Sequence, residues 1–285
     1  MTAPSPTHPQ FDLEQVTRSY WRVTFENGPV NLIDPDTVEQ LATVLTRVED
    51  DPHLTVVVFD SSNPQYFMAH WDLTSDRERV ATMAPGPTGR HPYLDNLLRL
   101  SRLPVVTISS IRGRVRGAGS EFVLATDIRF AGDRASLGQV EVGLGSIPGG
   151  GAMARLARLV GRGRAMEILL GADDFSGELA ERYGYVNRVL PDAGLDGFVD
   201  AFARRIAGFD RTAVAGTKEL LDRASLPPDD ELDPGLRAFF ATSGRPENAG
   251  RAKALFALGL QTPDGVELDL GRAVGEVSRT LAEEM

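Results

Sequence analysis

Residues 113–156 read GRVRGAGSEFVLATDIRFAGDRASLGQVEVGLGSIPGGGAMARL, and this segment carries most of the information in the chain. Its GAG turn, residues 117–119, consists of small residues that let a ligand approach the backbone, and it leads into a predicted helix whose first N–H groups favour negative charge. Glu121 lies in the first turn of that helix, and Glu141 follows after two short predicted strands that can return the chain to the same place. Two carboxylates beside backbone N–H groups suit enolate chemistry, because the amides hold an oxyanion while the carboxylates move protons.

The flanking segments predict an α/β fold. Residues 54–60 and 104–111 are short, apolar, β-branched runs, typical of strands covered on both faces. Asp34 and Pro35 predict a helix start, because they supply a capping side chain and a proline in the first turn. The other predicted elements are strands over 19–26, 127–131, 135–138 and 185–190, and helices over 93–103, 117–125, 149–170 and 178–182. The alternation of strands and helices favours parallel pairing.

Length and composition limit the possible classes of protein. The chain has 285 residues, and we expect a disordered tail over 1–15, a core over 16–192 and a helical section over 193–285. Its 30 basic and 40 acidic residues give a net charge of −10, which disfavours binding to nucleic acid or to an anionic membrane. It has no cysteine, which excludes disulfides and thiolate metal sites. We see neither a secretory signal nor an apolar run near the roughly 20 residues that span a bilayer, and we expect a cytoplasmic protein.

Three blocks in order resemble one known family. Residues 117–151 resemble the "GGGCE…D…A…FGQPE…LG-IPG-GG" segment of the enoyl-CoA hydratase/isomerase (crotonase) superfamily. Residues 64–73, PQYFMAHWDL, stand where that family has "F-AGADL", and residues 165–191 resemble the helices and strand that follow. The resemblance covers roughly residues 16–225. It implies a crotonase-like (ClpP/crotonase) spiral of strand–strand–helix repeats with a C-terminal helical section.

The resemblance also implies roles for individual residues. The backbone N–H groups of Ala69 and Ala118 would hold a thioester carbonyl. Glu121 would activate water and Glu141 would protonate the α-carbon, in syn hydration or dehydration of a 2-enoyl-CoA. Family members that shift double bonds or cleave carbon–carbon bonds typically lack one of these acids. Because this chain has both, the resemblance favours a hydratase, which belongs to the lyase class of enzymes. The expected substrate-binding residues are Met68, His70, Trp71, Gly117 and Gly149.

The same resemblance bears on partners. It implies no metal and no cofactor, with coenzyme A entering only as part of the acyl-CoA substrate. It implies a homo-oligomer, a trimer or a dimer of trimers, in which the section over 193–285 forms contacts and covers the acyl pocket. The reaction would belong to fatty acid metabolism.

Departures from the family pattern keep alternatives open. His70 and Trp71 replace two small residues, which could narrow the coenzyme A groove or indicate a carrier-protein or non-thioester substrate. We expect Arg112, Arg114 and Arg116 to form a solvated or interface surface rather than a phosphate clamp. In one alternative, the protein has the same fold but catalyses isomerisation, decarboxylation, carbon–carbon hydrolysis or a biosynthetic enolate reaction. Another is a non-catalytic binding or scaffold protein, including an RNA-binding one.

Overall fold

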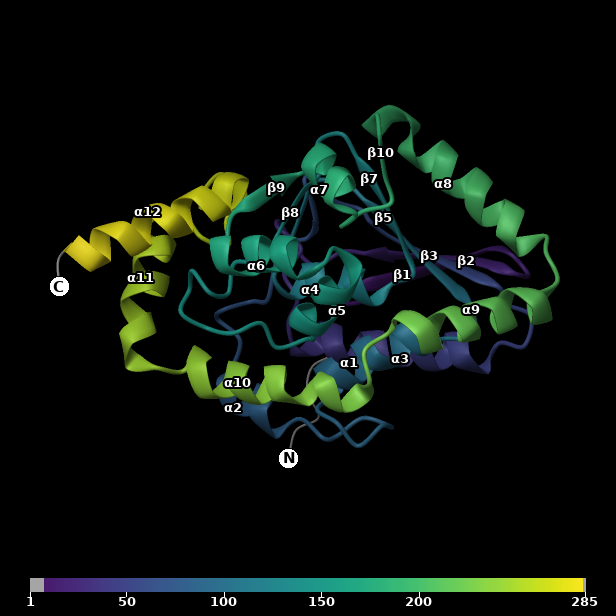
Figure 1. Ribbon diagram of the computed structural model, residues 1–285, viewed down its shortest axis with the longest axis horizontal. Coiled ribbons are helices and arrows are strands. Elements are labelled where there is room, and N and C mark those ends of the chain that lie inside the picture. Colours follow the sequence, from purple (N-terminus) through teal and green to yellow (C-terminus); the bar gives the residue numbers. More distant parts are fainter. Residues whose placement is uncertain (1–7, 284–285) are drawn as a thin grey trace.

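The computed structural model describes residues 8–283, and two sheets form its centre (Figure 1). The six-stranded sheet has the order β1 (Phe11–Thr17), β2 (Tyr20–Phe25), β3 (Val56–Ser61), β5 (Val106–Ile111), β7 (Ile128–Gly132) and β10 (Arg188–Leu190). The four-stranded sheet has the order β4 (Tyr66–Met68), β6 (Arg114–Arg116), β8 (Ser136–Gly138) and β9 (Asp174–Ser176). All neighbours from β2 to β10 in the larger sheet are parallel, as predicted, and β1 alone is antiparallel.

The chain alternates between the two sheets in a regular order. It passes from β3 to β4, from β5 to β6 and from β7 to β8, and helices return it to the larger sheet. The helices of this part are α1 (Pro35–Asp50), α2 (Arg77–Thr82), α3 (Pro92–Arg102), α4 (Ala118–Ala125), α5 (Ala152–Leu159), α6 (Arg162–Gly171) and α7 (Gly177–Tyr183). This is the predicted spiral of strand–strand–helix repeats, and the α/β fold class is confirmed.

Local signals place several elements correctly. Asp34 caps α1 by accepting a hydrogen bond from the Thr37 amide at 2.7 Å, and Pro35 is the first helical residue. The single helix predicted over 149–170 is instead two helices, because Gly161 between them has φ +80° and ends the first. The strands β4, β6 and β9 were not predicted, because three residues are too few to show an alternating pattern.

The N-terminal prediction needs a correction. The expected disordered tail ran to residue 15, but β1 begins at Phe11 and pairs with β2 along its length. The Phe11 and Phe25 rings lie 5.1 Å apart, so the strand is fixed by apolar packing as well as by backbone pairing. Residues 1–7 lie outside the described part of the chain.

Beyond residue 192 the chain is helical, as predicted, and it wraps around the core (Figure 1). The helices are α8 (Asp192–Ala207), α9 (Arg211–Ser225), α10 (Asp233–Ser243), α11 (Ala249–Ala257) and α12 (Leu270–Glu283), with short 3-10 turns η1 (Asp229–Glu231), η2 (Pro246–Asn248) and η3 (Val266–Asp269). α8 covers the larger sheet with Leu195, Val199 and Ala203. α10 packs Leu236 against Leu94 and Leu98 of α3. In residues 8–283 no helix combines the length and apolar character needed to cross a membrane.

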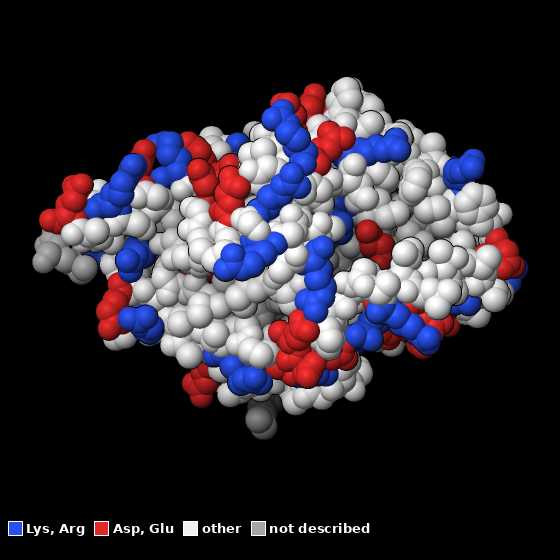
Figure 2. Space-filling view, in the orientation of Figure 1, with Lys and Arg blue, Asp and Glu red and all other residues white. Residues whose placement is uncertain are grey.

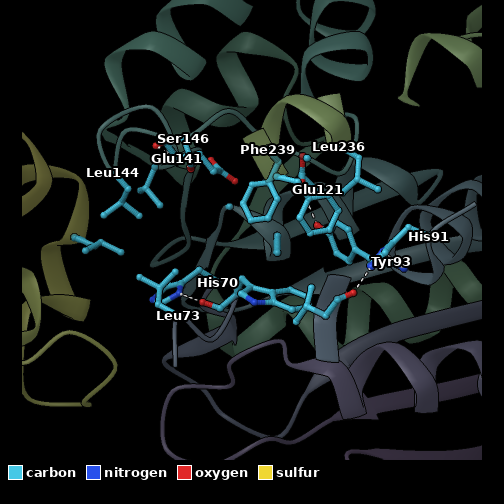
Figure 3. A pocket seen from close by; sticks show the side chains of 18 of the residues that line it. His70, Leu73, His91, Tyr93, Glu121, Glu141, Leu144, Ser146, Leu236 and Phe239 are labelled. Atoms are coloured by element: carbon cyan, nitrogen blue, oxygen red, sulfur yellow. Dashed lines mark hydrogen bonds between the residues drawn. The ribbon is translucent and has the colours of Figure 1, made fainter. Parts of the chain in front are cut away.

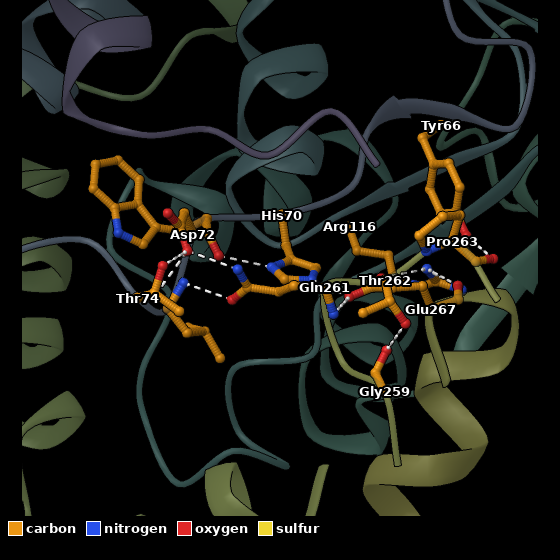
Figure 4. A network of polar contacts seen from close by, with 12 residues as sticks. Tyr66, His70, Asp72, Thr74, Arg116, Gly259, Gln261, Thr262, Pro263 and Glu267 are labelled. Atoms are coloured by element: carbon orange, nitrogen blue, oxygen red, sulfur yellow. Dashed lines mark hydrogen bonds and ion pairs between the residues drawn. The ribbon is translucent and has the colours of Figure 1, made fainter. Parts of the chain in front are cut away.

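A buried polar network joins the C-terminal section to the core (Figure 4). Arg116 is completely buried; its Nη2 donates to Asp174 at 2.8 Å and its Nη1 donates to the Glu267 carbonyl at 3.0 Å. Glu267 is also fully buried and accepts from His70 Nε2 at 2.7 Å and from the Gln261 amide at 2.9 Å. The prediction of a solvated or interface surface is therefore wrong for Arg116, because two acids remote in sequence enclose its guanidinium.

Candidate active site

One cavity lies between the GAG turn and the C-terminal helices (Figure 3). It encloses about 760 Å³, part of it open to solvent, which is the size of a small-molecule site. Its lining residues are mostly apolar and come from both halves of the chain: His70, Trp71, Leu73, Val80, His91, Tyr93, Gly117, Ala118, Glu121, Val140, Glu141, Leu144, Ser146, Gly149, Leu236, Phe239, Phe240, Leu260 and Leu270. The two predicted acids are thus in the same cavity.

Glu121 is held by three hydrogen-bond donors. Its Oε1 accepts from the Gly150 amide at 2.6 Å and from the Ala152 amide at 3.3 Å, at the start of α5. Its Oε2 accepts from the Tyr93 hydroxyl at 2.6 Å. Burial raises the pKa of Glu121, and the hydrogen bonds from Tyr93, Gly150 and Ala152 oppose that rise because they favour the charged form.

Glu141 has a different environment. The Gln139 side-chain amide lies 3.0 Å from Glu141 Oε2 and 2.8 Å from Ser120 Oγ, and it can turn either its carbonyl or its NH2 group toward the carboxyl. Burial and the nearby charge of Glu121 raise the pKa of Glu141 to about 8. Glu141 therefore keeps its proton at neutral pH.

Two backbone amides at the cavity are unoccupied. In residues 8–283, neither the Ala118 N–H nor the Trp71 N–H has a hydrogen-bond acceptor. Ala118 is the first residue of α4, where N–H groups have no partner within the helix. In the parallel bridge between Ile33 and Trp71, the bonds to Ile33 are made by the His70 carbonyl and the Asp72 amide, so the Trp71 amide points to the other side.

The prediction that Ala69 supplies an oxyanion donor is wrong. The Ala69 amide donates to the Asn31 carbonyl at 3.0 Å, and Ala69 is completely buried away from the cavity lining. An amide already engaged in this way cannot hold a substrate oxygen. Ala118, the other predicted donor, has the required free amide, and Trp71 was predicted only as a substrate-binding residue.

The other predicted substrate-binding residues divide into two groups. Trp71, Gly117 and Gly149 line the cavity, and their binding of substrate stays a prediction. Met68 does not: it is 1% exposed, belongs to the main core and faces a smaller neighbouring cavity. His70 borders the cavity, but its Nε2 faces Glu267 and its Nδ1 lies 2.7 Å from the Trp71 carbonyl, so both ring nitrogens are engaged in the protein's own network.

Sequence reasoning missed three kinds of functional residue. Tyr93 was assigned only to a predicted helix, and no local signal indicates that its hydroxyl reaches Glu121. Gln139 lies within the GQVE motif, yet only the fold brings its amide between Ser120 and Glu141. The apolar wall from Phe239 and Phe240 lies beyond residue 225, outside the segment that resembles the family.

Comparisons with known proteins identify the family of the chain. A model of the enoyl-CoA hydratase/isomerase family matches residues 16–232. The short-chain-enoyl-CoA hydratase of Clostridium acetobutylicum is 31% identical over 196 residues, which are 68% of this chain and 74% of that protein. The crotonyl-CoA hydratase of Syntrophomonas wolfei is 33% identical over 200 residues, 69% of this chain and 75% of that protein. The crystal structure of an enoyl-CoA hydratase candidate from Streptomyces avermitilis superposes with a TM-score of 0.89 at 40% identity, covering 96% of this chain and 99% of the other.

The match of fold, motif order and overall sequence extends over most of the chain. Both acids and the small-residue turn lie within the matched region. The chain therefore belongs to the enoyl-CoA hydratase/isomerase family, the crotonase superfamily that its sequence resembles, and it is an enzyme.

Proposed function

We propose that the enzyme catalyses the reversible syn hydration of a 2-enoyl-CoA thioester to a 3-hydroxyacyl-CoA. The observation that carries this proposal is the unequal pair of acids in one cavity. Glu121, with three donors, is suited to be the base, and Glu141, whose pKa is raised to about 8, is suited to be the acid. The names of the relatives support the same chemistry.

The proposed reaction assigns one role to each group. The Trp71 and Ala118 amides donate to the thioester oxygen and stabilise the negative charge that develops there. Glu121 accepts a proton from water as the water oxygen bonds to the β-carbon. Glu141 donates its proton to the α-carbon, so one proton and one hydroxide are added and the enolate collapses to the thioester. Dehydration reverses these steps.

The cavity favours a neutral, apolar acyl group. No lysine or arginine is among its lining residues. The two lining histidines are engaged: His70 pairs with Glu267, and His91 contacts the Val80 carbonyl with Nε2 and accepts the Tyr93 amide with Nδ1. Burial lowers the pKa of His91, which keeps that ring neutral. A second carboxylate on the acyl chain would therefore be buried unpaired, which is costly.

The test follows the conjugated thioester absorbance of crotonyl-CoA, with glutaconyl-CoA as the anionic analogue of similar size. We expect turnover of crotonyl-CoA and a kcat/KM at least about 100-fold lower for glutaconyl-CoA, because its charge lacks a partner. Binding of crotonyl-CoA without turnover would refute the hydratase assignment and favour another enolate reaction. Equal rates for the two thioesters would refute only the assignment of the acyl group.

A nucleic-acid-binding role has little support. On the face drawn in Figure 2, basic and acidic side chains are interspersed, and the chain as a whole carries a net charge of −10. In a gel-shift assay at low salt, we expect that the protein does not retard RNA. Retardation by RNA would revive that alternative.

We also propose a homo-oligomer, a trimer or dimer of trimers, in the expected cytoplasmic location. Support comes from apolar side chains left on the surface around α9, where Phe209, Leu220 and Leu221 are all more than half exposed. Sedimentation should give a single species larger than the 30.8 kDa chain. A monomer at micromolar concentration would contradict it.

A further inference from the structure

We propose that the Tyr93 hydroxyl is the positioning group that keeps Glu121 ionised, so that Glu141 is the member of the acid pair that carries a proton. The inference rests on the proposed function for its catalytic consequence. Which of the two carboxyls carries a proton can be measured without turnover.

The hydrogen bonds of Glu121 are complementary to a carboxylate. The Gly150 and Ala152 amides can only donate, and both point at Oε1. A proton on Glu121 would therefore have to reside on Oε2, the oxygen that lies 2.6 Å from the Tyr93 hydroxyl. While the phenol donates to Oε2, that oxygen cannot carry a proton aimed at Tyr93.

Tyr93 is held in the orientation this requires. Its ring packs edge-on against Trp71 at 5.6 Å, and its amide donates to His91, the residue that caps α3. Burial and the adjacent Glu121 carboxylate hold the pKa of Tyr93 well above its ordinary value, so the phenol keeps its proton and has it available to donate to Oε2.

The other charged groups near Glu121 do not replace this contact. Arg155 of α5 attracts the anion through space, but its Nη2 donates to the Leu97 carbonyl, and among the described residues it makes no hydrogen bond to Glu121. Glu141 acts in the opposite direction, because its ionised form would repel a charged Glu121. Of the groups that donate to Glu121, only the Tyr93 hydroxyl comes from a side chain and can be removed by one substitution.

The experiment compares Tyr93→Phe with Tyr183→Phe. Tyr183 is a matched control, because its hydroxyl also donates to a glutamate, Glu167, at 2.9 Å, but on the surface. In Tyr93→Phe the acidic limb of the pH profile of kcat/KM should move up by about one to two pH units, which is the effect expected for loss of a hydrogen bond to a charged group. In Tyr183→Phe the limb should stay in place. An unmoved acidic limb in Tyr93→Phe would overturn the proposal, whether or not the rate falls uniformly.

A second measurement titrates the unmutated enzyme and needs no turnover. Carbon-13 NMR of glutamate-labelled protein follows the two carboxyl carbons through a pH titration, with signals assigned by their loss in Glu121→Gln and Glu141→Gln. The Glu121 signal should titrate at lower pH than that of Glu141. The reverse order would refute the inference, and the correct order in a protein that hydrates no acyl-CoA would refute only the proposed function.

Discussion

Gly150→Ala tests the position of Glu121 without altering any catalytic group. Gly150 has no positive φ, so alanine fits its backbone conformation. A Cβ built at this position lies 2.8 Å from Glu121 Cδ and 2.7 Å from Leu97 Cδ1, whereas ordinary Cβ contacts begin near 3.4 Å. The Glu121 carboxyl must therefore move by more than half an ångström, away from the amide that holds it.

The displacement should affect rate and stability very differently. A misplacement of about 1 Å at a reacting group costs about 100-fold in rate, so we expect kcat for crotonyl-CoA to fall by about that factor. The groups that must yield are the ends of two side chains, so the free energy of unfolding should fall by only about 1–3 kcal/mol. Stopped-flow loss of enoyl absorbance measures the first quantity, and urea denaturation measures the second.

Gly163→Ala is the matched control. Gly163 lies in α6, and no atom lies within 4 Å of the place that an added methyl group would take. This substitution should therefore leave kcat unchanged and, as a glycine-to-alanine change in a helix, stabilise the protein slightly. A folded Gly150→Ala enzyme with the kcat of the unmutated protein would refute the argument, because the rate would then not depend on where Glu121 lies.

Three further results are expected. Glu121→Gln and Glu141→Gln should each lower kcat for hydration at least about 100-fold, because each variant loses one acid–base group. Near-normal rates in both variants would refute the proposed mechanism. The kcat/KM of the unmutated enzyme, which reports the groups of the free enzyme, should decline above about pH 8, because the pKa of Glu141 is raised to about 8 and its acid form is lost beyond that pH. A flat kcat/KM from pH 7 to 9.5 would contradict this role. Arg116→Met should lower the free energy of unfolding by about 3–5 kcal/mol, since it leaves the Asp174 carboxylate and the buried Glu267 carbonyl without the guanidinium that donates to them. Arg182→Met on the surface should cost less than about 1 kcal/mol. Equal losses in denaturant melts would show that the buried network does not stabilise the fold.

Residue patterns were sufficient to predict an α/β fold class, parallel pairing of the strands and the two acids. These are local properties: β-branched runs identify buried strands, Asp34 and Pro35 identify a helix start, and the GAG and GQVE motifs carry Glu121 and Glu141. Each such signal lies within a few residues of the element it specifies, so it can be recognised without knowing what packs against it.

Three-dimensional packing was needed to show which backbone amides and side chains are available to a substrate. Ala69 has the right place in the motif, but its amide is taken by Asn31, and Trp71 two residues later has the free one. His70 is engaged by Glu267, 197 residues away in the chain. A hydrogen-bonding group is free or occupied according to its partner in space, and a partner that far along the chain leaves no mark on the local pattern of residues.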